Sequence, residues 1–92
     1  MPPFDEQNRP GLARGVRLQP DVKTGEPLLL YPEGVLYLSE TAYDIVSRCN
    51  GEQTISNIIS SLAREYEVEQ ETLQQDVLDC LKDLHQRKLV VF

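Results

Sequence analysis

The sequence predicts an α+β fold of the winged helix-turn-helix type, in which a three-stranded antiparallel sheet is followed by three helices. Two observations support this class. Short apolar segments separated by turn residues occupy the chain up to residue 38, and apolar residues at helical spacing occupy the rest. With 92 residues, the chain is long enough for one domain with a single modest core.

Residues 1–14 are predicted to form a flexible N-terminal tail, and residues 15–92 a single domain. Pro2, Pro3 and Pro10, together with Gly11, leave no periodic apolar pattern in the first segment. Deleting residues 1 to about 11 is therefore expected to change the free energy of unfolding by less than about 1 kcal/mol.

Three strands are expected in the first half of the domain. The segment Gly15–Gln19 alternates apolar and polar residues, as a strand with one buried face does. Leu28–Tyr31 forms the second strand. Pro32 and Gly34 favour a tight turn, so the third strand, Val35–Leu38, should pair antiparallel with the second.

The third strand carries no polar side chain to place in water. Val35, Leu36, Tyr37 and Leu38 are apolar on both faces of the strand, so both faces should be covered, one of them by something other than the chain itself. In a three-stranded meander this strand lies at an edge, unless the C-terminal segment Leu89–Phe92 covers it.

Three amphipathic helices are expected after the sheet. Ser39 is the predicted N-cap of the first, which should end at Asn50-Gly51. Thr54 caps the second, whose apolar residues recur at helical spacing up to Tyr66. The third should begin between Glu69 and Thr72, where Thr72 and Gln75 fit a capping box.

The composition argues against several classes of function. The formal net charge is −6, and the third helix carries Glu71, Asp76, Asp79 and Asp83, so this surface would repel DNA. No apolar run reaches membrane-spanning length. One histidine, two scattered cysteines and the lack of a nucleophile with a nearby base predict no catalysis, no metal and no cofactor. We expect a cytoplasmic protein that is not an enzyme and binds neither nucleic acid nor membrane.

The residues along the chain resemble those of the PqqD family. These proteins of pyrroloquinoline quinone biosynthesis are the prototype of the peptide-recognition domains used in ribosomal peptide modification. The resemblance rests on Arg9–Leu18 (RPGLARGVRL), Asp21, Leu28–Gly34 (LLLYPEG), Leu38, Ala42, Cys49–Gly51 (CNG), Thr54, Ile58, Tyr66, Asp76-Val77 and Leu81. Asn50 stands where the family more often has Asp, a change that the end of a helix should tolerate.

The resemblance implies a non-catalytic peptide chaperone. Such a protein binds the precursor peptide PqqA and presents it to PqqE, the radical S-adenosylmethionine enzyme that crosslinks a Glu and a Tyr of that peptide. In related domains the peptide adds as a strand beside the third strand and lies against the third helix. The peptide-binding residues implied here are Val35, Leu36, Tyr37, Leu38, Asp76, Val77 and Cys80. An apolar edge strand suits this role because its backbone groups are free to pair.

Two alternatives remain open from the sequence. The same apolar edge could pair with a second copy of the chain, which would make the protein a dimerisation module and a possible homodimer. A DNA-binding winged helix is the other alternative, and it lacks the basic face that such a role requires.

Overall fold

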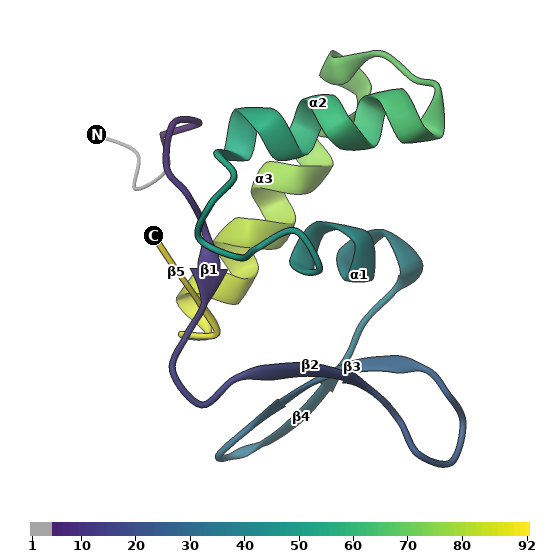
Figure 1. Cartoon of the computed structure of the whole chain (residues 1–92), viewed down its shortest axis with the longest axis vertical. Coiled ribbons are helices and arrows are strands. Elements are labelled where there is room, and N and C mark those ends of the chain that lie inside the picture. The colour runs from purple at the N-terminus through teal and green to yellow at the C-terminus, as the bar shows by residue number, and fades with distance from the viewer. Residues whose placement is uncertain (1–4) are drawn as a thin grey trace.

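The computed structural model describes residues 5–92, and it confirms the predicted α+β class. Helices α1 (Glu40–Val46), α2 (Ile55–Tyr66) and α3 (Gln70–Gln86) lie on one side of a three-stranded sheet (Figure 1). The strands of this sheet are β2 (Arg17–Pro20), β3 (Pro27–Tyr31) and β4 (Gly34–Tyr37). A second, two-stranded sheet joins β1 (Gly11–Leu12) to β5 (Val90–Val91), near the two ends of the chain.

The larger sheet is an antiparallel meander in the order β2-β3-β4. Leu29 lies opposite Leu36 in β4 and opposite Leu18 in β2, so these three side chains share one face. Leu29 is fully buried, and Leu18 and Leu36 pack against the same core cluster. This face therefore meets the helices, and the face that carries Leu30 and Val35 points away from them.

The core lies between the sheet and the three helices. Its fully buried side chains come from every helix and from both ends of the domain; they include Leu29, Ile45, Ile55, Ile58, Leu62, Val77, Leu81 and Val90. The predicted helical spacing of the second and third helices is therefore the spacing of their buried faces. Within residues 5–92 no polar or charged residue is buried.

The N-caps predicted for the first two helices are confirmed. Ser39 Oγ accepts the N–H of Ala42 at 3.1 Å, and Thr54 Oγ1 accepts the N–H of Asn57, also at 3.1 Å. The predicted end of the first helix at Asn50-Gly51 is too late, because α1 ends at Val46. Beyond it the chain tightens into i to i+3 bonds such as Cys49 N–H to the Val46 carbonyl.

The capping box expected at Thr72 and Gln75 is wrong. Helix α3 begins at Gln70, before Thr72 but inside the predicted range, with Glu69 at the N-cap position and no side-chain cap bond. The earlier start is possible because Glu67 adopts the left-handed conformation (φ 58°) that ends α2, which leaves only a short connection before the next helix.

Residues 5–14, expected to be a flexible tail, lie against the helices in the structure; residues 1–4 are outside the described part of the chain. Pro10 is fully buried, and its carbonyl accepts the N–H of Gly51. The carbonyls of Asn8 and Glu6 accept the N–H groups of Ile55 and Ser56, two of the donors that the first turn of α2 leaves without intrahelical partners. Backbone bonds hold this segment, which explains why it shows no apolar periodicity.

Deleting residues 1–10 is consequently expected to lower the free energy of unfolding by about 2 kcal/mol. The loss combines the burial of Pro10 with three backbone hydrogen bonds, each contributing a net of roughly 0.5–1.5 kcal/mol after exchange with water. Urea denaturation of the shortened and full chains would measure it. A change below about 0.5 kcal/mol would show that this segment adds nothing to stability.

The C-terminal segment does not cover the third strand of the meander. Val90 and Val91 of β5 pair instead with Leu12 and Gly11 of β1, and the Leu89 carbonyl accepts the N–H of Ala13. In the described part of the chain, β4 therefore has one neighbouring strand, β3, and its other edge is open.

Candidate functional site

The hydrogen-bond pattern of the β3–β4 hairpin shows which residues of β4 face the open edge. The N–H of Leu38 donates to the carbonyl of Pro27 at 3.0 Å. Hydrogen-bonded pairs alternate along an antiparallel ladder, so Leu36, opposite Leu29, also points its backbone groups toward β3. The N–H and C=O groups of Val35 and Tyr37 consequently point outward.

The edge at β2 offers fewer backbone donors to an incoming strand than the edge at β4. Asp21 N–H donates to the Glu26 carbonyl at 2.7 Å, and by the same alternation Leu18 and Pro20 face outward. Pro20 has no N–H to offer, and the N–H of Val16, just before the strand, is taken by the Ala13 carbonyl. The two edges of the sheet thus differ: of these residues at β2 only Leu18 keeps an outward N–H, whereas Val35 and Tyr37 both keep theirs at β4.

The chain itself covers one face of the third strand, and the expected cover of the other face from outside the chain stays a prediction. Leu36 and Leu38 are partly buried against the core, as predicted. Val35 and Tyr37 remain 46% and 52% exposed on the face away from the helices. The chain thus covers only the inner face of β4.

Tyr37 is fixed in place by a hydrogen bond across this outer face. Its phenol donates to Asp21 Oδ2 at 2.5 Å, which links β4 to the loop between β2 and β3. The Tyr37 phenol and the backbone N–H of Lys23 stabilise the carboxylate, so the pKa of Asp21 is lowered below 3.8. The same bond raises the pKa of Tyr37 above 10. Because the Asp21 pKa is depressed, this bond contributes to stability above about pH 4 and weakens as the pH falls through the folded-state value.

Replacing Tyr37 by Phe is expected to raise the pKa of Asp21 toward 3.8. The substitution keeps the ring and removes the hydrogen bond that contributes most to the depressed pKa. An NMR titration of the Asp21 carboxyl would measure the change, with Tyr43→Phe as the matched control on another exposed tyrosine. An unchanged Asp21 pKa in Tyr37→Phe would show that the phenol does not hold the carboxylate.

The three residues implied on the third helix occupy different environments. Val77 is fully buried in the core, so its side chain is shielded from any ligand at the surface. Asp76 is exposed, and Cys80 is partly buried against the core cluster. Of the seven residues implied by the resemblance, the structure brings Leu36, Leu38, Val77 and Cys80 to one core cluster.

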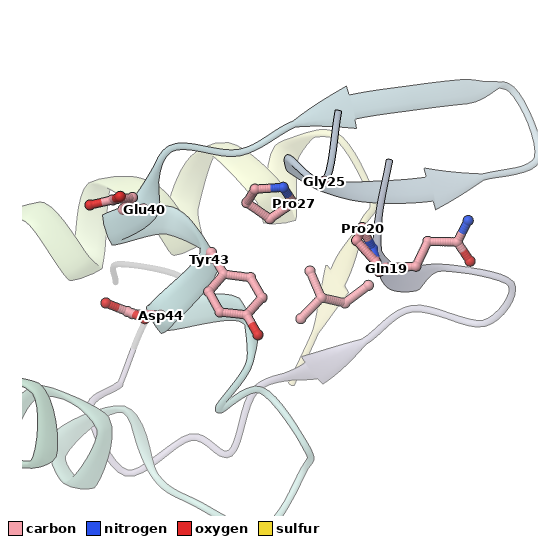
Figure 2. A pocket seen from close by; sticks show the side chains of 8 residues that line it. Gln19, Pro20, Gly25, Pro27, Glu40, Tyr43 and Asp44 are labelled. Carbon is pink, nitrogen blue, oxygen red and sulfur yellow. The ribbon is translucent and has the colours of Figure 1, made fainter. Parts of the chain in front are cut away.

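A pocket of 580 Å³ lies between α1 and the loop end of the β2–β3 hairpin (Figure 2). It is lined by Leu18, Gln19, Pro20, Gly25, Pro27, Glu40, Tyr43 and Asp44. The side chains of Glu40 and Asp44 point away from Pro20 and Pro27, and the Tyr43 ring lies between the two groups (Figure 2). The pocket is on the β2 side of the sheet, so it is separate from the open edge at β4.

Two kinds of group among the described residues bear on catalysis: possible metal ligands and thiols. Within residues 5–92 no three His, Cys, Asp or Glu side chains gather to hold a metal ion. Burial raises the pKa of the Cys49 thiol to about 12 and that of Cys80 to about 11, so both stay protonated at neutral pH. None of the described helices has the length and apolarity needed to cross a membrane.

The outward orientation of Val35 and Tyr37 was not predicted from the sequence, although one feature points to it. Pro32 and Glu33 form a two-residue loop, and Tyr31 and Gly34, which flank that loop, pair directly. In such a hairpin the flanking pair is hydrogen-bonded, which makes every second residue from Val35 face outward.

Comparison with known proteins gives consistent results. Residues 26–90 match the family model described as Coenzyme PQQ synthesis protein D (PqqD). A protein of Xanthomonas axonopodis pv. citri named PqqA binding protein is 32% identical over 90 residues, which cover 98% of each chain.

Two solved structures are also similar. The PqqD truncation of Methylobacterium extorquens PqqCD, described as a functional and stand-alone RiPP recognition element, superposes with a TM-score of 0.82 at 29% identity. That match covers 97% of this chain and 95% of the other. PqqD from Xanthomonas campestris gives a TM-score of 0.62 at 31% identity, covering 97% and 99%.

Proposed function

The chain belongs to the PqqD family, and on this basis we propose that it binds the precursor peptide PqqA as an added strand along the open edge of β4. The binding is non-catalytic and serves pyrroloquinoline quinone biosynthesis. Relatives named PqqA binding protein, and the M. extorquens structure described as a recognition element, support the choice of ligand.

The observation that carries the proposal is the difference between the two edges of the sheet. At β4, the N–H and C=O groups of Val35 and Tyr37 face outward, so an incoming strand gains up to four main-chain hydrogen bonds there. At β2, Pro20 and the occupied N–H of Val16 leave no comparable row. This difference in backbone donors supports β4 as the edge for strand addition.

The inward-facing side chains of the peptide would lie beside Leu36 and Leu38 and toward α3. Cys80 is partly buried against the same core cluster as these two leucines, and Asp76 is exposed on α3, so both are candidates for contact. Val77 is assigned a supporting role, because its burial allows it to fix the position of α3 but not to touch the peptide.

The proposal extends to presentation of the bound peptide to the radical enzyme PqqE. A strand added at β4 becomes the new edge of the sheet, so one side of its backbone stays open to a second protein. A cytoplasmic location is part of the proposal, and the two free thiols, Cys49 and Cys80, suit a reducing compartment. A second copy of the chain is the competing occupant of β4, and a homodimer formed this way should dissociate when the peptide is added.

Replacing Val35 by Pro tests the binding edge. Proline removes an outward N–H and its ring obstructs the incoming strand, so affinity for a synthetic PqqA peptide should fall by at least about thirtyfold. Val35→Thr keeps the N–H and should bind within about tenfold of the wild type. Calorimetric titration would compare the variants after circular dichroism shows that both are folded. Wild-type affinity in folded Val35→Pro would move the binding site away from β4.

A further inference from the structure

Three exposed apolar side chains form a continuous patch on the outer face of the sheet, next to the open edge. Val35 and Tyr37 are 46% and 52% exposed, and Leu30, directly opposite Val35 in β3, is 36% exposed. We call Leu30, Val35 and Tyr37 the outer patch. Strand register places its members side by side, whereas the other exposed large apolar residues of residues 5–92 lie outside the three-stranded sheet.

Two members of the outer patch, Val35 and Tyr37, are also the residues whose backbone groups face the open edge. Side chains of a strand alternate between the faces of a sheet, so every second side chain of a strand added at β4 would lie on the outer face. One of these would stand beside Val35 and another beside Tyr37, two residues apart in the peptide. This holds for a parallel or an antiparallel strand, because both place side chains in rows across the sheet.

The patch is organised before any ligand arrives. The phenol of Tyr37 is held by Asp21 Oδ2 at 2.5 Å, which fixes the ring over the outer face. Leu28 lies opposite Tyr37 on this face and is only 5% exposed. Since the ring is already ordered, a peptide side chain that packs on it loses less conformational freedom on binding than it would beside a mobile ring.

We infer that the outer patch reads the side chains of the bound peptide on the face away from the helices, and that it selects apolar residues at two positions two apart. The inference rests on the proposed strand addition. Cross-strand pairs between β-branched or aromatic side chains are the favourable ones on such a surface, and a charged residue beside Val35 would lie against apolar neighbours. The helix side and the outer side of the edge would thus each contribute to specificity.

Val35→Thr and Leu30→Thr test the inference. Threonine keeps the backbone N–H and favours strands, but it replaces an apolar side chain by a polar one. Val35→Thr is expected to weaken binding of a synthetic PqqA peptide by about threefold to fivefold, the size of one cross-strand pair, and Leu30→Thr, one strand further from the peptide, by about twofold. Val68→Thr is the matched control, because Val68 is 40% exposed but lies between α2 and α3. It should bind as the wild type does. The positions that a serine scan of the peptide finds sensitive should include two that are two residues apart on the outer face, and the effect at one of these two should shrink in Val35→Thr.

The outcomes separate the inference from the proposed function. If Val35→Pro abolishes binding while Val35→Thr and Leu30→Thr keep wild-type affinity, strand addition stands and the outer patch is overturned. If Val35→Pro also keeps wild-type affinity, both strand addition at β4 and the role of the outer patch are overturned. Weakening in both Thr variants, together with an unaffected Val68→Thr and the alternating pattern in the peptide scan, supports the inference.

Discussion

Leu36→Pro is expected to unfold the three-stranded sheet, although Val35→Pro, one residue away, is expected to leave it folded. The N–H of Leu36 points toward β3, so proline would remove a bond inside the sheet and leave the Leu29 carbonyl without its partner. The Leu36 side chain also packs against the core. Together these losses should cost about 3–4 kcal/mol, a large part of the stability of a domain of this size.

Circular dichroism and urea denaturation of the two proline variants would measure this difference. Val35→Pro removes only an N–H that faces solvent, so its free energy of unfolding should fall by less than about 1 kcal/mol. If Val35→Pro unfolded and Leu36→Pro stayed folded, the assignment of inward and outward residues on β4 would be reversed, and the proposed binding edge with it.

Leu29→Ala is expected to destabilise the protein by about 3 kcal/mol. Leu29 is fully buried at the centre of the middle strand, and truncation removes apolar burial and leaves a cavity where the sheet meets the helices. Leu30→Ala is the matched control on the next residue, which is 36% exposed on the opposite face, and it should cost less than about 1 kcal/mol. Chemical denaturation would compare them. Equal losses would contradict the assignment of Leu29 to the core face.

The fold was predictable because most of its helices and strands are indicated by short, local sequence patterns. The turn at Pro32-Glu33, the caps at Ser39 and Thr54 and the apolar spacing of α2 are all local features, and the structure contains each of them. The prediction of a capping box at Thr72 was wrong because Glu67 adopts a left-handed conformation, which sequence patterns rarely indicate for glutamate. The packing of residues 5–14 was not predicted, because it depends on hydrogen bonds to backbone carbonyls, which leave no pattern in the sequence.

The candidate site was predictable in part. An apolar edge strand could be found from the sequence of Val35–Leu38, but a sequence does not state which of its faces the rest of the chain leaves uncovered. Asp76, Val77 and Cys80 are close in sequence, yet a helix turns by roughly 100° per residue, and the turn places Val77 in the core. Whether these residues meet a ligand depends on tertiary packing rather than on spacing.

Pro20, at the blocked edge of the sheet, also limits how far chains could polymerise. Two copies joined through β4 would use the same edge on each partner, and the pair would present only its two β2 strands to solution. A third chain would find no continuous row of donors there, because Pro20 has no N–H and that of Val16 is already bonded. A meander open on both sides would instead grow, chain after chain, into a filament. If copies of the chain pair through β4, Pro20 should therefore limit the assembly to two chains.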